Sequence, residues 1–96
     1  LRLEEDMMHE RGAKPVKFSA HAREQMRYRG ATEQEVEEAI LSSPWEPAEL
    51  GRWQCRREFA YGREWNGRYY AMKQVRPIFV EEQDEIVVVT VYVYYY

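Results

Sequence analysis

The 96-residue sequence predicts an α+β fold, with two N-terminal helices packed on one face of a three- to four-stranded antiparallel sheet. Helix-capping residues and helical spacing of apolar residues are confined to residues 18–41. Alternation of apolar and polar residues, which is typical of strands, dominates the chain from residue 52 onward. We expect residues 1–14 to form a flexible leader and residues 15–96 to form a single domain.

The first helix is predicted between Ser19 and Gly30. The Ser19 hydroxyl can accept a hydrogen bond from the free N–H groups of a first helical turn. Gly30 suits the left-handed residue that ends many helices, because glycine adopts positive φ at little cost. This helix carries a histidine and three arginines, which are His21, Arg23, Arg27 and Arg29.

The second helix is predicted to begin at Thr32, which forms a Thr-x-x-Glu capping box with Glu35. Three apolar residues then fall on one face at helical spacing: Val36, Ala39 and Ile40. Pro44 ends the helix, because proline cannot continue the hydrogen-bond ladder and disfavours helical backbone at the residue before it.

A β-hairpin is predicted across residues 52–75. Residues 52–61 alternate as a strand with one buried face, but Arg57 falls on the apolar side and must be paired or face a pocket. Asn66 and Gly67 both tolerate positive φ and predict the turn, after which residues 68–75 form the second strand. Cys55 alternates with core residues, so we expect a buried thiol.

The strongest predicted strand covers residues 85–96. Strict alternation places one set of valines on a face that suits packing under helices: Val87, Val89, Val91 and Val93. The opposite face carries threonine and tyrosine and is expected to line a groove: Ile86, Val88, Thr90, Tyr92 and Tyr94. Because such a strand aggregates when exposed, we expect it to be paired on both edges or covered by a partner.

The net charge of −3 is unevenly distributed, because residues 52–76 contain seven basic and two acidic residues. A polyanion could bind this basic segment through phosphate contacts, although such a pattern also fits a mixed, solvated surface. The single cysteine excludes an internal disulfide and fits the reducing cytoplasm, where we expect the protein. No apolar run spans a membrane, and His9, His21 and Cys55 lack metal-ligand spacing, so no cofactor is expected.

One set of motifs resembles a bacterial and archaeal family of small domains of unknown function. The set comprises His21-Ala22-Arg23, Met26, Arg29-Gly30, the Thr32 capping box and Ile86-Val87-Val88-Val89-Thr90-Val91-Tyr92. This family is grouped with the RelE/ParE-like superfamily of toxin nucleases, and the resemblance covers about residues 16–93. It implies a RelE-like fold and a toxin-like, metal-independent endoribonuclease with an antitoxin partner.

The resemblance also implies a site. Cleavage by the RNA 2′-OH, which leaves a 2′,3′-cyclic phosphate, needs an acid, a base and cations for the phosphorane. His21 would be the acid/base candidate, Arg29 and Arg57 would stabilise the phosphate, and Thr90 and Tyr92 would orient the phosphate or a base. The RNA-binding candidates are Arg23, Trp53, Arg56, Tyr69, Lys73 and Arg76.

An interaction domain without catalytic activity, homodimeric through the tyrosine-rich last strand, is the alternative. The two hypotheses make different spatial predictions. A nuclease requires His21, Arg57 and either Thr90 or Tyr92 to converge on one concave, basic pocket. An interaction domain predicts an isolated His21 and a flat apolar patch along residues 92–96.

Overall fold

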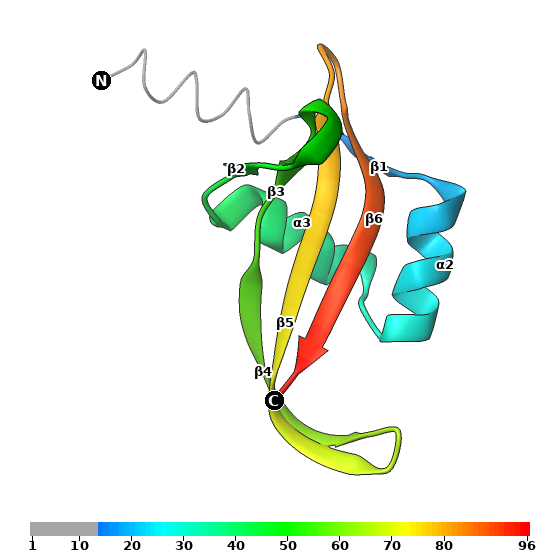
Figure 1. Cartoon of the computed structure of the whole chain (residues 1–96), viewed down its shortest axis with the longest axis vertical. Coiled ribbons are helices and arrows are strands. Elements are labelled where there is room, and N and C mark those ends of the chain that lie inside the picture. Colours follow the sequence, from blue (N-terminus) through cyan, green and yellow to red (C-terminus); the bar gives the residue numbers. More distant parts are fainter. Residues whose placement is uncertain (1–13) are drawn as a thin grey trace.

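The computed structural model describes residues 14–96, in which two helices lie on one side of a six-stranded mixed sheet (Figure 1). The helices are α2 (Ala20–Arg29) and α3 (Glu33–Ser42), and a short 3₁₀ turn, η1, covers Glu49–Gly51. The strands are β1 (Val16–Phe18), β2 (Glu46–Pro47), β3 (Trp53–Gln54), β4 (Arg57–Trp65), β5 (Arg68–Glu81) and β6 (Ile86–Tyr95). The strand order is β1-β6-β5-β3-β2, and β4 also pairs with β5.

The predicted sheet of three to four antiparallel strands is wrong in both strand number and direction. The sheet has six strands, and β1 runs parallel to β6. β1 contains only three residues and β2 two, so neither is long enough to show a period-2 pattern. The single strand predicted over residues 52–61 is divided into β3 and the first part of β4. β1 is held by backbone hydrogen bonds at both ends, from Ile86 N to Pro15 O at 2.9 Å and from Ser19 N to Val88 O at 3.0 Å.

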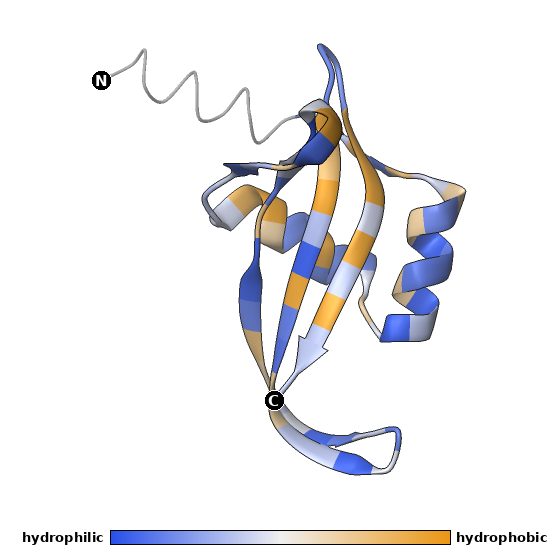
Figure 2. Cartoon of the chain, in the orientation of Figure 1, coloured by the Kyte–Doolittle hydropathy of each residue, from blue (hydrophilic) through white to orange (hydrophobic). Residues whose placement is uncertain are grey.

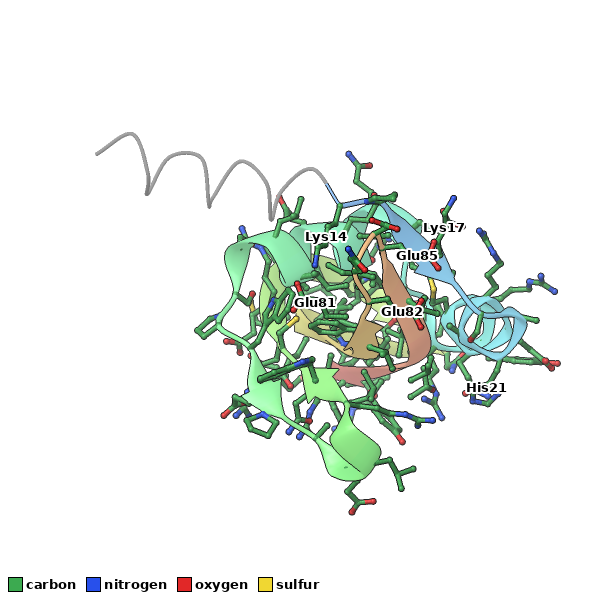
Figure 3. All side chains as sticks on the ribbon, turned by 90° about the horizontal axis from the view of Figure 1, so that it is seen from above. Lys14, Lys17, His21, Glu81, Glu82 and Glu85 are labelled. Atoms are coloured by element: carbon green, nitrogen blue, oxygen red, sulfur yellow. The ribbon has the colours of Figure 1, made fainter. Side chains whose placement is uncertain are left out.

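The predicted start of the domain near residue 15 falls at β1. The leader predicted over residues 1–14 lies outside the described residues, apart from Lys14. The Lys14 ammonium forms an ion pair with Glu81 at 2.9 Å, beside the turn that joins β5 to β6. Figure 3 shows these two side chains near each other at one end of the sheet.

The helix signals are confirmed. Ser19 Oγ accepts from Ala22 N at 3.0 Å, and Gly30 ends α2 in a left-handed conformation with φ of 82°. Thr32 and Glu35 form both hydrogen bonds of the capping box, at 3.1 and 3.0 Å. These signals act within four residues of one another, which explains why the sequence alone reveals them.

The hydrophobic core lies between the helices and the sheet face that they cover. The helices contribute Ala22, Met26, Val36, Ala39 and Ile40, and the sheet side contributes Cys55, Val75, Phe79, Ile86, Val88 and Val91. The predicted burial of Cys55 is confirmed, and this burial raises the pKa of its thiol to about 12. Trp45 closes the edge of the core, with its ring 4.8 Å edge-on from Phe79 and its indole N–H donating to Ile40 O. Figure 2 shows apolar and polar residues alternating along β5 and β6.

The predicted all-valine face of the last strand is wrong in its first half. Ile86 and Val88 are fully buried, whereas Val87 and Val89 are half-buried. The register with β5 shifts between Ile78–Thr90 and Phe79–Val88, so Val89 is an extra residue in β6. Because the extra residue breaks the alternation, the residues before the bulge occupy the face opposite to the one predicted for them. Beyond it Val91 is buried, and Thr90, Tyr92 and Tyr94 lie on the opposite face from Val91, as predicted.

Candidate functional site

A pocket of about 590 Å³ lies on the sheet face that the helices leave uncovered. Its sheet residues are Gln54 of β3, Arg76 and Ile78 of β5, and Thr90 and Tyr92 of β6, with Arg52 and residues 47–50 completing the wall. Thr90 pairs with Ile78 and Tyr92 pairs with Arg76, and directly opposed residues of antiparallel strands point to the same face. Their chain neighbours Val75 and Val91 are buried on the helix side.

Arg76 is the best-positioned cation in the pocket. Its Nε and Nη2 donate to the single Oε1 oxygen of Gln54, at 3.1 and 2.9 Å. The Gln54 Nε2 in turn donates to Pro47 O at 3.4 Å, so the amide orientation is set by β2. Within residues 14–96 Arg76 forms no ion pair. The guanidinium is therefore held in place by a neutral group, and no carboxylate among the described residues balances its positive charge.

Two hydroxyl groups and a second arginine accompany Arg76. The side chains of Thr90 and Tyr92 line the pocket, and neither hydroxyl has a hydrogen-bond partner in the described part of the chain. Arg52 also lines the pocket, and its guanidinium is likewise without a partner among the described residues. Hydroxyl and guanidinium donors around one cavity are the groups that bind a phosphate.

Arg29 joins this group from the helix side of β6. Its Nη1 donates to Val91 O at 2.9 Å, and its guanidinium carbon lies 5.0 Å from the centre of the Tyr92 ring. These contacts fix Arg29 at the outer edge of β6 and bring a positive charge to the Tyr92 face. Arg29, Arg76, Thr90 and Tyr92 are thus the predicted site residues that the fold brings together.

His21 lies outside the residues that line the pocket. It is exposed near the start of α2, and Figure 3 shows its ring projecting from α2 on the side of the molecule away from α3. The start of α2 is tied to β6, because Ser19 Oγ donates to Val89 O at 3.2 Å. His21 therefore stands beside the uncovered face, at the flank of β6.

Three predicted site residues, Arg57, Lys73 and Trp53, instead make contacts on the side of the sheet that the helices cover. Arg57 donates to Ser42 Oγ at 2.8 Å and lies 3.6 Å from a Glu38 oxygen, which satisfies the expectation that its charge is paired. Lys73 is buried and donates to Gly30 O. Trp53 packs against the Trp45 ring, with 6.0 Å between the ring centres. The predicted convergence of Arg57 with Thr90 or Tyr92 therefore does not occur, because the sheet separates them.

The remaining predicted RNA-binding residues lie at separate places on the surface. Arg23 forms an ion pair with Glu33, and its guanidinium lies 5.3 Å from the Phe18 ring centre. Arg56 pairs with Glu46 at 3.2 Å, and Tyr69 is exposed on β5 near the hairpin turn. These residues do not line the pocket.

Sequence reasoning missed Gln54 and Arg52 as site residues. Gln54 occupies a polar position of a two-residue strand, and its role depends on pairing with β5, which places it opposite Ile78 and within reach of Arg76. The alternation of residues 52–61 does assign Arg52 and Gln54 to the polar face. That assignment is the signal that, combined with the sheet order, would have found them.

Comparison of the chain with known protein families, curated proteins and solved structures finds no match. The resemblance to the RelE/ParE-like superfamily therefore stays a prediction. Neither helix of the described residues could span a bilayer, because each has only ten residues and several of them are charged. The same part of the chain contains no group of three or more His, Cys, Asp or Glu side chains placed to hold a metal ion.

Proposed function

We propose that this protein is a toxin-like, metal-independent endoribonuclease that binds RNA in the pocket on the uncovered sheet face and acts in the cytoplasm. The site differs from the one that the resemblance implied, because Arg57 lies on the helix side of the sheet and His21 lies outside the pocket lining. Arg76 takes the role expected of Arg57, and its position carries the proposal. Two of the five guanidinium N–H donors are used by Gln54, which leaves three for phosphate oxygens. An arginine held without a carboxylate is prepared to bind a phosphodiester.

The proposed reaction is transesterification within the RNA. The 2′-oxygen loses its proton and forms a bond to the neighbouring phosphorus, while the bond from phosphorus to the 5′-oxygen breaks and that oxygen gains a proton. The products are a 2′,3′-cyclic phosphate and a 5′-hydroxyl. Arg76 stabilises the negative charge that builds on the phosphorane oxygens, which is the largest single contribution in many enzymes.

The proton-transfer roles fall to His21 and Tyr92 in this proposal. An imidazole suits this work because its ordinary pKa lies near neutral pH. His21 stands at the flank of β6, beside the face on which Tyr92 and Arg76 lie opposite each other. An RNA strand that crosses β6 would meet both, with Thr90 available to hydrogen-bond a phosphate oxygen. An antitoxin partner would inhibit the enzyme by covering this face.

Cleavage of a mixed-sequence RNA in the presence of a chelator tests the proposal. We expect the wild type to release 2′,3′-cyclic phosphate ends, and Arg76→Ala to slow cleavage on the order of 100-fold or more. His21→Ala should slow it by a similar factor. Arg27→Ala is the matched control, because Arg27 is exposed on α2, away from the pocket lining, and its loss changes the net charge equally.

Two results would contradict the proposal. One is cleavage by Arg76→Ala at the rate of the Arg27→Ala control. The other is the absence of cleavage by folded wild-type protein, because that leaves the pocket without the activity assigned to it.

The interaction-domain alternative draws on a different observation. Tyr92, Tyr94 and Tyr96 are 41%, 45% and 53% exposed and follow one another on β6 and just beyond it. Exposed tyrosines are enriched at protein interfaces. A homodimer through this strand would be seen as a doubled mass in sedimentation, and it would be lost on Tyr94→Ala.

A further inference from the structure

The exposed tyrosines form a row that begins at the pocket. Tyr92 pairs with Arg76 and Tyr94 with Gln74 across the β5–β6 ladder, and Tyr96 exchanges both backbone hydrogen bonds with Met72. All three therefore lie on the uncovered face, whereas the neighbouring Val91 and Val93 pack toward the core. In the described part of the chain none of the three hydroxyls has a hydrogen-bond partner. The Tyr92 ring contacts the Arg29 guanidinium, whereas no ring or cation contact involves Tyr94 or Tyr96 among the described residues.

The spacing of the row selects one form of nucleic acid. Alternate residues of an antiparallel strand are about 6.8 Å apart. Stacked bases along one strand of a duplex are about 3.4 Å apart, so bases seated on successive tyrosines must be unstacked. Only an unpaired, extended strand can adopt this spacing without first melting a duplex.

Positive charges on the uncovered sheet face indicate where a phosphate of such an RNA strand would bind. Tyr92 has the Arg29 guanidinium 5.0 Å from its ring centre and Arg76 as its cross-strand partner. Gln74 and Met72, the partners of Tyr94 and Tyr96, are neutral. Glu58 lies one strand farther away, paired with Gln74 from the β4 side. A polyanion is therefore favoured beside Tyr92, where the Arg29 and Arg76 side chains lie.

We propose that Tyr92, Tyr94 and Tyr96 form a track for single-stranded RNA, in which three successive bases stack on the three rings and the phosphate beside the first base is bound by Arg76. This inference rests on the proposed function and names its substrate class as unpaired RNA. Base stacking on aromatic side chains tolerates any sequence, because every base has a flat face. The track therefore predicts weak sequence preference and strong preference for unpaired strands.

Fluorescence anisotropy with a labelled 2′-O-methyl RNA tests the track, because this RNA lacks the 2′-OH and is not cleaved. The same sequence annealed to its complement is the duplex probe. We expect the wild type to bind the single strand more tightly than the duplex, and Tyr94→Ala to weaken single-strand binding about tenfold. Tyr94→Phe should bind within about twofold of the wild type, since it keeps the ring. Tyr28→Ala is the control, because Tyr28 is 72% exposed on α2.

The outcomes separate this inference from the proposed function. Wild-type affinity in Tyr94→Ala, or equal binding of the duplex, would overturn the track. If Arg76→Ala at the same time loses both binding and cleavage, the proposed function stands without the track. If the wild type neither binds nor cleaves RNA and sediments as a dimer that Tyr94→Ala dissociates, the row is a self-association surface and both proposals fail.

Discussion

A neutral amide, rather than a carboxylate, holds the Arg76 guanidinium. Gln54 accepts two N–H groups through one oxygen, and its own amide nitrogen is tied to Pro47 O. A carboxylate in the same place would give stronger hydrogen bonds, but it would also neutralise the charge that a phosphate needs. The pairing thus combines fixed geometry with an available positive charge.

Gln54→Glu tests this arrangement at a single residue. The carboxylate should keep the hydrogen bonds to Arg76 and form an ion pair with it, so the fold should be retained while RNA binding weakens about tenfold or more. Anisotropy with the 2′-O-methyl RNA measures the effect, and thermal unfolding checks the fold. Gln83→Glu is the matched control, since Gln83 is exposed between β5 and β6 and the charge change is the same. Equal affinity in the two variants would show that Arg76 does not contact the RNA.

Gly30 allows the aromatic end of the sheet to pack against the end of α2. A Cβ at this position would lie 2.5 Å from the Tyr95 hydroxyl oxygen and 2.7 Å from the Trp65 ring. Trp65 and Tyr95 are themselves stacked, and the Tyr95 hydroxyl donates to Arg29 O at 2.7 Å. A side chain at residue 30 would therefore push apart contacts that hold two strands to a helix.

Gly30→Ala should destabilise the protein more than Gly67→Ala. The two glycines have nearly equal φ, 82° and 84°, so the backbone strain is similar, of about 1 kcal/mol. Nothing lies within 4 Å of the Cβ position at Gly67, so only Gly30→Ala adds a clash. Urea unfolding should give a loss for Gly30→Ala that exceeds the control by roughly 1–3 kcal/mol. Equal losses would mean that the aromatic contacts adjust without cost.

Which arginine faces the pocket could not be predicted from the residues alone. Arg57 and Arg76 lie in the same basic segment, where Arg57 shares the face of Cys55 and Phe59 and Arg76 lies between Val75 and Pro77. Their faces depend on strand register, since Arg57 pairs with Val75 on the helix side and Arg76 pairs with Tyr92 on the uncovered side. Register is a property of the assembled sheet, so the correct set of predicted residues was visible only in the fold.

At the scale of elements, a buried lysine joins β5 to the junction of the two helices. The Lys73 ammonium donates to Gly30 O at 2.8 Å and forms an ion pair with a Glu35 oxygen at 2.8 Å. It also lies 5.5 Å from the Tyr61 ring centre. Glu35 also accepts from Thr32 N in the capping box. One carboxylate therefore serves both the start of α3 and the attachment of α3 to the sheet.

Glu35→Gln separates these two roles. Glutamine can still complete a capping box, but the Lys73 charge would remain buried without a carboxylate. We expect a loss of roughly 3 kcal/mol in the free energy of unfolding, measured by urea denaturation. Glu38→Gln, which removes an exposed partner of Arg57, should cost under about 1 kcal/mol. A similar small loss for both variants would show that the Lys73 pair contributes little.

The elements differ in how far the sequence predicts them. Both helices and the β4–β5 hairpin are signalled by residues close in sequence, such as the Ser19 cap and the Asn66-Gly67 turn. β1 and β2 carry no such signal, because each is a short segment that becomes a strand only by pairing with another. The strand predicted over residues 52–61 is divided into β3 and β4, since β3 pairs with β5 beyond the hairpin. The bulge at Val89 likewise arises from the pairing of β6 with β5 and shifts the face of every residue before it.

At the scale of the whole molecule, two groups whose pKa is raised by burial make the free energy of unfolding depend on pH in the alkaline range. Burial raises the pKa of the Cys55 thiol from 9.0 to about 12. Burial, with smaller contributions from Tyr61 and Glu35, raises the pKa of Tyr95 from 10.0 to about 12. In each case the unfolded chain loses the proton at a lower pH than the folded protein. The stabilisation is complete below about pH 9 and is lost as the pH rises toward 12.

We therefore expect the free energy of unfolding to fall between pH 9 and pH 12, and to fall less steeply in Cys55→Ala. The variant should be less stable at neutral pH, because the thiol fills a buried position. Urea denaturation across this pH range compares the two slopes. Parallel slopes would contradict ionisation of Cys55 as a source of the alkaline loss.

The two faces of the sheet differ. The helices cover one face, and the pocket and the tyrosine row lie on the other. The predicted groove on the Thr/Tyr face corresponds to this uncovered face, with Thr90 and Tyr92 in the pocket wall. Predicting the complete site would have required the sheet order, since its residues come from β2, β3, β5, β6 and η1. These segments are brought together only when the sheet is assembled.

The most direct test of the account is to map where RNA binds by NMR. Titrating the isotope-labelled protein with the single-stranded 2′-O-methyl RNA should shift backbone amides of residues 52–54, 76–78 and 90–96, which cover the pocket and the row. Amides of α3, on the opposite side of the sheet, should remain unchanged. Shifts confined to α3, or no shifts when the RNA is in large excess over the protein, would contradict the assignment of the uncovered face as the RNA-binding site.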